Sequence, residues 1–172
     1  CKKQIISCHK NIEENVFIKA DPNAIDRIVN NVIENAIKFS NNEGKIEITL
    51  QTVDDKIHFS VKDAGIGIPS DLQKKIFEPY YQINQKKTGL QGMGLGLPIV
   101  KKVVDSLGGQ IHIKSNPAEA SGTEVTIILN KHVPTENEVP VTNPLESKFR
   151  IPNTERFEVA DTPFHPNRPS VL

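Results

Sequence analysis

Two asparagines and a lysine, Asn31, Asn35 and Lys38, are spaced four and three residues apart in a stretch predicted to be helical. Residues at these spacings lie on the same side of a helix, so the three side chains form one column. Asparagine is a poor helix former because its side chain competes for backbone hydrogen bonds, so its repetition here invites an explanation. An amide oxygen is a hard, neutral ligand suited to Mg²⁺, and a lysine ammonium supplies a point charge for phosphate. The column predicts a site for Mg²⁺ and phosphate; the alternative is a column that caps neighbouring strands.

A glycine-rich stretch at residues 89–100, GLQGMGLGLPIV, contains Gly89, Gly92, Gly94 and Gly96. Glycine reaches positive φ and lets another group approach the backbone closely. A helix is predicted to follow, and the N–H groups at the start of a helix attract phosphate oxygens. The stretch is a candidate phosphate-binding loop; the alternative is a flexible connection before a helix.

A carboxylate followed by two glycines, Asp63, Gly65 and Gly67, stands at the end of a predicted strand. Two glycines make a tight bend beside the acidic group. A carboxylate in this position can accept a hydrogen bond from an exocyclic amine such as that of adenine. The alternative is an aspartate that only caps the turn.

The elements that position these residues follow from the hydropathy pattern. A capped start at Asp21-Pro22 predicts a helix to about Phe39, and Ser70 with Gln73 predicts a short helix opened by a capping box. The remaining predictions are a helix at 98–107, strands at 45–53, 56–63, 110–115 and 123–130, candidate strands at 5–6 and 16–18, and a loop at 80–91. Hairpins with helices between them predict an α/β sandwich, with helices on one face of a mixed sheet.

The composition limits the classes of function. The chain has 172 residues, of which 21 are basic and 21 acidic, so its net charge is zero. This balance argues against a broad surface for nucleic acid or for anionic membranes, and no apolar run approaches the roughly 20 residues of a membrane span. Two cysteines, Cys1 and Cys8, are expected to be free thiols in a reducing compartment. We therefore expect a cytoplasmic domain, whether or not the parent protein is anchored in a membrane.

The chain divides by composition into two parts. Residues 1–132 are predicted to form one domain, and residues 133–172 a Pro-rich linker that leads to a further domain. Seven of the twelve prolines and none of the ten glycines lie in the second part, which is typical of an extended segment. Since the chain begins abruptly, we expect it to be a piece of a longer protein.

Five short motifs stand in an order that resembles the catalytic and ATP-binding domain of bacterial sensor histidine kinases. Asn31 to Ala36 looks like the N box and Asp63 to Gly67 like the G1 box. The others are Phe77-Glu78-Pro79, like the F box, Gly92 to Leu97, like the G2 box, and Gly122-Thr123, like the G-T motif. The resemblance covers about residues 16–131 and extends to the superfamily of gyrase, heat-shock chaperone, kinase and MutL ATPases. It implies a Bergerat-type sandwich with a mostly antiparallel sheet.

The resemblance also implies roles for individual residues. Asn35 would ligate Mg²⁺, Asn31 and Lys38 would support the phosphates of ATP, and Asp63 would read adenine. Glu34, one turn from Lys38, is a candidate to meet the incoming histidine. The remaining residues implied at the nucleotide are Phe39, Gly65, Gly67, Ile68, Gly92, Met93, Gly94, Leu95, Gly96, Leu97 and Thr123.

Departures from the family pattern qualify the expected reaction. ATP-hydrolysing relatives carry a Glu one turn before the metal-binding Asn, whereas this chain has Asn31, which cannot act as a base. Transfer to a histidine is thus favoured over hydrolysis. Many relatives carry an Arg after the F box, where this chain has Gln82, so Lys86 or Lys87 would have to replace it.

The partners implied lie outside the chain. No His stands in the sequence context of a phosphate acceptor, so the acceptor histidine and its dimerisation domain are expected upstream, in a homodimeric protein. A response-regulator receiver domain, in the same protein or another, is the expected next acceptor. The alternatives are a degenerate nucleotide-binding or interaction module, and a related Ser kinase or ATPase.

Overall fold

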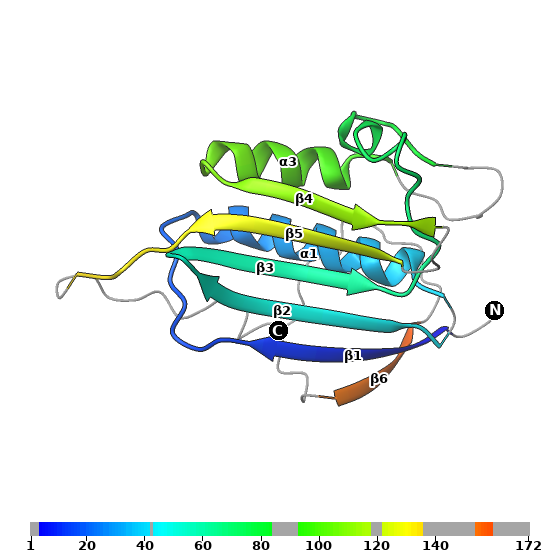
Figure 1. Cartoon of the computed structure of the whole chain (residues 1–172), viewed down its shortest axis with the longest axis horizontal. Helices are drawn as coiled ribbons and strands as arrows, with labels where there is room; N and C mark the ends of the chain where they lie inside the picture. Colours follow the sequence, from blue (N-terminus) through cyan, green and yellow to red (C-terminus); the bar gives the residue numbers. More distant parts are fainter. Residues whose placement is uncertain (1–3, 42, 84–92, 118–121, 136–153, 160–172) are drawn as a thin grey trace, which may run out of the picture.

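The computed structural model describes residues 4–41, 43–83, 93–117, 122–135 and 154–159. These form two layers, with helices α1 and α3 packed together against one face of a β-sheet (Figure 1). In chain order the elements are β1 (Gln4–Ile12), α1 (Pro22–Phe39), β2 (Lys45–Val53), β3 (Lys56–Asp63), the 3₁₀ helix η1 (Lys75–Phe77), α3 (Gly96–Ser106), β4 (Gln110–Ser115), β5 (Thr123–Asn130) and β6 (Thr154–Val159). The predicted α/β sandwich is confirmed.

The sheet is mixed and mostly antiparallel, as predicted. Its strand order is β4-β5-β3-β2-β1-β6. Among the described strands, only β1 and β2 pair in parallel, and α1 provides the crossover that a parallel pair requires. The other four pairings are antiparallel. The carboxyl end of β3 therefore lies beside the amino end of β5, and Asp63 is directly opposite Thr123.

Helix α1 begins and ends at the predicted residues. The Asp21 carboxylate accepts a hydrogen bond from the Asn23 N–H at 2.9 Å, and Pro22 occupies the first turn, where its missing N–H costs nothing. At the other end, Ser40 adopts an extended conformation and its N–H donates to the Ala36 carbonyl. These two ends fix which residues of the helix face the sheet.

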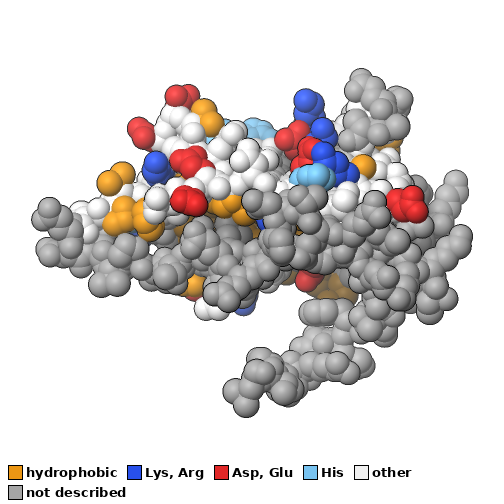
Figure 2. Space-filling view, turned by 90° about the horizontal axis from the view of Figure 1, so that it is seen from below, with side chains coloured by type: hydrophobic (Ala, Val, Ile, Leu, Met, Phe, Trp, Pro, Cys, Tyr) orange, Lys and Arg blue, Asp and Glu red, His pale blue; other side chains and the backbone are white. Residues whose placement is uncertain are grey.

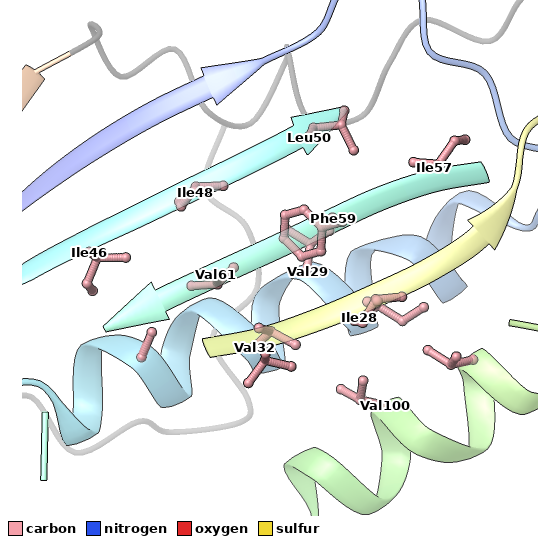
Figure 3. Packing of buried hydrophobic residues seen from close by; sticks show 14 of the residues in the cluster. Ile28, Val29, Val32, Ile46, Ile48, Leu50, Ile57, Phe59, Val61 and Val100 are labelled. Carbon is pink, nitrogen blue, oxygen red and sulfur yellow. The ribbon is translucent and has the colours of Figure 1, made fainter. Parts of the chain in front are cut away.

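The core lies between the two helices and the sheet. Val100 and Val104 of α3 are fully buried, and Val32 of α1 and Val61 of β3 are 1% exposed. Figure 3 shows Val32, Val61 and Val100, from α1, β3 and α3, among the packed side chains of this layer. Burying an aliphatic side chain of this size contributes roughly 1.5–3 kcal/mol. The core thus holds α1, α3 and β3, the three elements that carry the predicted site residues.

Two local predictions were wrong. Residues 16–18 form no strand; Val16 and Ile18 instead pack at the border of the core. The stretch after Ser70 forms turns and then the 3₁₀ helix η1, without the predicted capping box. Gln73 bonds the carbonyls of Ile68 and Ser115 instead, because those acceptors are brought within its reach by the fold.

The part of the chain that we predicted to be a linker contributes one strand. β6 pairs with β1 over six residue pairs, from Gln4 opposite Val159 to His9 opposite Thr154. It adds a sixth strand at the β1 edge of the sheet.

The described surface mixes charges of both signs. Figure 2 shows acidic and basic side chains interspersed over the described part of one face, in keeping with the equal numbers of both kinds in the sequence. None of the helices within the described residues is both long and apolar enough to cross a bilayer.

Candidate functional site

The amide column of α1 and the glycine stretch before α3 meet in space. A Cβ built on Gly96 would lie 2.9 Å from Asn31 Oδ1 and 3.6 Å from Asn35 Nδ2. The amino end of α3, with its outward N–H groups, is therefore beside the amide side chains of α1. A methyl group at this position would displace the Asn31 side chain. The two predicted features therefore lie next to each other in the fold.

The column side chains are held at the edge of the buried face of α1. The Asn31 amide nitrogen donates to the Arg27 carbonyl at 2.7 Å, which turns the Asn31 carbonyl oxygen toward Gly96. Lys38 Nζ lies 5.2 Å from the centroid of the Phe39 ring, and burial lowers the pKa of Lys38. Glu34 is exposed on the same helix. Asn31 thus directs its carbonyl oxygen, and Asn35 its amide group, toward Gly96, and Lys38 adds an ammonium group further along α1.

Asp63 forms a second corner of the site. Its side chain is buried, and its Oδ1 accepts hydrogen bonds from the N–H groups of Gly65 at 2.8 Å and Thr123 at 3.2 Å. Burial raises the pKa of Asp63, and the bonds from Gly65 and Thr123 partly offset that rise. Both bonds end on Oδ1, so Oδ2 is left to accept from another donor.

Glycines allow the backbone to close around Asp63. A Cβ on Gly65 would lie 2.1 Å from the Phe39 carbonyl oxygen, and one on Gly122 would lie 1.9 Å from the Asp63 carbonyl oxygen. Gly65 also forms an isolated β-bridge with Ser40, directly after α1. Gly65 therefore joins the carboxyl end of α1 to the turn that follows Asp63.

Ser115 and Gln73 tie the G1-box loop to the turn before β5. The Ser115 hydroxyl accepts from the Ile68 N–H and donates to the Gly122 carbonyl, both at 2.7 Å. The Gln73 amide donates to the carbonyls of Ser115, at 2.8 Å, and Ile68, at 3.1 Å. Neither residue is predicted from the sequence to support the site, because their partners are up to 47 residues away and no local pattern reports such contacts.

The described ends of the predicted lid are joined by a backbone hydrogen bond. The Tyr80 N–H donates to the Gly94 carbonyl at 2.9 Å, and both residues have positive φ, 66° and 67°. A Cβ on Gly94 would lie 2.8 Å from the Tyr81 carbonyl oxygen, so glycine is needed here. Gly89, Gly92, Lys86 and Lys87 lie outside the described residues.

The other predicted nucleotide residues flank these corners. Gly67 has a φ of 71° and is buried against Ser115 and Pro117, with Ile68 next to it. Met93, 74% exposed, precedes α3, while Leu95 and Leu97 are half-buried around its first turn. The fold thus gathers the described site residues where α1, α3 and the β3–β5 end meet.

Comparison with known proteins agrees with this arrangement. The model of the histidine kinase-, DNA gyrase B- and HSP90-like ATPase family matches residues 20–133. The sensor histidine kinase WalK of Bacillus subtilis (strain 168) is 33% identical over 132 residues, which is 74% of this chain and 21% of WalK. The chain thus spans about a fifth of the length of this curated relative.

Solved structures give the same result. The nucleotide-free catalytic domain of the histidine kinase ThkA is 31% identical, with a TM-score of 0.63, over 73% of this chain and 79% of that domain. Full-length ShkA in complex with AMPPNP is 26% identical, with a TM-score of 0.65, over 76% of this chain and 26% of ShkA. The fold is the Bergerat sandwich of these kinase domains, and the chain belongs to the histidine kinase-, DNA gyrase B- and HSP90-like ATPase family.

Proposed function

We propose that this chain is the ATP-binding catalytic domain of a two-component sensor histidine kinase. It would transfer the γ-phosphoryl group of ATP to a histidine on a dimerisation domain elsewhere in the same protein. The observation that carries the proposal is the approach of Gly96 to Asn31 and Asn35, which brings a helix amino end and an amide column to one place. A triphosphate with its cation fits such a combination of donors and neutral oxygens.

Asn35 is the residue that we assign to the metal. Among the described residues no three His, Cys, Asp or Glu side chains gather to hold an ion, so a cation here would depend on the amide oxygen together with phosphate oxygens and water. This donor set suits Mg²⁺, which keeps several waters and binds through few protein ligands. Bound there, Mg²⁺ would neutralise phosphate charge, while Lys38 supplies a further cation.

Asp63 is the residue that we assign to the base. Its buried carboxylate is oriented by two backbone N–H groups through Oδ1, and Oδ2 can accept from the adenine amine. Guanine carries a carbonyl at the same position and would face the carboxylate as a second acceptor. Phe39 is the last residue of α1, and the next residue, Ser40, forms the β-bridge with Gly65 beside Asp63.

Transfer rather than hydrolysis follows from the chemistry of Asn31. Its amide cannot take a proton from water, and its nitrogen is already bonded to the Arg27 carbonyl. Phosphoryl transfer needs mainly alignment and charge stabilisation, which the column and the α3 amino end supply. A receiver-domain aspartate would accept the phosphoryl group next.

Incubation with γ-labelled ATP tests this function. The chain is mixed with a supplied dimerisation domain that carries the acceptor histidine, and label on that domain is compared with free phosphate. We expect label on the histidine domain only when Mg²⁺ is present, with little free phosphate. Phosphate release without labelling would instead identify an ATPase.

One observation favours a second function, a nucleotide-binding module without transfer. Gln82 stands where many relatives carry an Arg near the γ-phosphate. Mg²⁺-dependent ATP binding without labelling of any histidine domain would support this second function.

A further inference from the structure

On the core-facing side of the sheet, the last row of side chains across β3, β5 and β4 is polar and consists of Asp63, Thr123 and Ser115. Thr123 lies opposite Asp63 in the β3–β5 pairing and opposite Ser115 in the β4–β5 pairing. Residues directly opposite in antiparallel strands share a face and touch one another. The next row along the same face is apolar, with Val61 and Val125 buried. Three hydrogen-bonding side chains are thus set side by side against the core.

The Ser115 hydroxyl donates its hydrogen to one defined acceptor. Its oxygen receives the Ile68 N–H, and its single hydrogen goes to the Gly122 carbonyl, which can only accept. Thr123 Oγ1 lies 3.2 Å from the same oxygen. Because Ser115 has no second hydrogen to give, Thr123 must be the donor in that contact. The hydrogen of Thr123 therefore points toward Ser115, and its lone pairs point away.

We propose that Ser115 is a positioning residue for the adenine site beside Asp63. By turning the Thr123 hydroxyl hydrogen away from the base, it leaves only hydrogen-bond acceptors facing the base there. Asp63 Oδ2 and Thr123 Oγ1 then both present lone pairs beside each other. An amine with two hydrogens matches two acceptors, whereas a carbonyl oxygen meets repulsion from both. The inference rests on the proposed function, since it takes Asp63 to face the nucleotide base.

ATP and inosine triphosphate test the inference, because they differ at the purine 6-position, an amine in one and a carbonyl in the other. The variants are Ser115→Thr and Ser115→Val, which have the same shape but differ in the hydroxyl. In Ser115→Val the Thr123 hydroxyl is free to turn its hydrogen to the carbonyl. We expect the ratio of ATP affinity to inosine triphosphate affinity to fall about threefold to tenfold, the range for one neutral hydrogen bond. Ser115→Thr should keep the wild-type ratio.

The pathway through Thr123 is tested in the Thr123→Val background. There, adding Ser115→Val should change the ratio no further. A matched control is Ser106→Ala, which removes a hydroxyl bonded to the Val103 carbonyl on the exposed side of α3 and should leave the ratio unchanged. Unfolding by denaturant is measured for every variant, and Ser115→Ala replaces Ser115→Val if the latter does not fold.

Two results would overturn the inference. Equal weakening of both nucleotides by Ser115→Val would show a general structural role, and a further change of the ratio in the Thr123→Val background would exclude the route through Thr123. Failure of the proposed function looks different. It would appear in the wild-type chain as no Mg²⁺-dependent ATP binding, or as no preference for ATP over inosine triphosphate.

Discussion

Gly96 approaches Asn31 so closely that a Cβ at position 96 would lie 2.9 Å from the Asn31 carbonyl oxygen. The contact joins the first residue of α3 to the middle of α1. It brings together two features that are 65 residues apart, the difference between 96 and 31. Their common location is the geometric basis for assigning one phosphate site.

Replacing Gly96 by Ala should weaken ATP binding about tenfold, because the added methyl displaces the Asn31 side chain. The free energy of unfolding should not fall, since Ala is the better helix former. Calorimetric titration with Mg-ATP measures the first effect and denaturant unfolding the second. In a Gly96→Ala, Asn31→Ala double variant the two losses should not add; additive losses would contradict the contact.

Replacing Asn35 by Ala should remove the Mg²⁺-dependent part of ATP affinity, a loss of more than about tenfold, because the proposed metal ligand is absent. Titrations with and without Mg²⁺ measure it. Asn30→Ala is the matched control, since Asn30 is exposed on the same helix. Unchanged affinity in Asn35→Ala would exclude the metal role.

Replacing Asp63 by Asn should abolish the preference for adenine over guanine nucleotides, because the amide offers a donor in place of Oδ2. The measurement is the ratio of ATP to GTP affinity, expected to fall about tenfold or more. The amide oxygen can still accept from Gly65 and Thr123, so the fold should persist. An Asp63→Asn variant that keeps the preference would reject the assignment.

The same variant has a predicted pH dependence of stability. Burial raises the pKa of Asp63 above 3.8 in the folded state, so folding favours the protonated acid. Its contribution to stability is present below pH 3.8 and is lost as pH rises through the raised pKa. Asp63→Asn should therefore gain stability relative to wild type at neutral pH, and the gain should shrink toward pH 3.8. Unfolding by urea at several pH values measures it, and a gain that grows on acidification would contradict the burial effect.

Replacing Gly65 by Ala should destabilise the fold by about 3 kcal/mol, because the methyl would lie 2.1 Å from the Phe39 carbonyl oxygen. Gly108→Ala is the matched comparison, with no atom within 4 Å but a φ of 66°. It should cost about 1 kcal/mol from backbone strain alone. Denaturant unfolding of both variants separates steric from conformational cost, and equal losses would contradict the close packing of Gly65.

The sequence predicts the regular elements well where local signals are strong. Asp21-Pro22 determines the start of α1, and β2 and β3 have the predicted bounds, with Asp54 and Asp55 at positive φ in the turn between them. Strict alternation of apolar residues leaves little freedom of register once one face is buried. Local patterning was therefore sufficient for these elements.

Local patterning failed where distant contacts decide the structure. Gln73 fits a capping box by spacing, yet its amide bonds the carbonyls of Ile68 and Ser115. Residues 16–18 are apolar enough for a strand but pack beside the core without a partner strand among the described residues. The role of Ser115 likewise depends on strand pairing. Motif spacing could indicate which residues approach the nucleotide, but not which ones orient them.

The pairing of β6 with β1 bears on how the molecule behaves in concentrated solution. An outer strand offers a row of open amide and carbonyl groups to any other chain, and templated aggregation begins at such margins. Residues Thr154–Val159 occupy that row along β1 and make the outer strand a short one, TERFEV, in which three of six residues are charged. A truncated chain ending before them would present the longer and more apolar β1 to its neighbours and should lose colloidal stability.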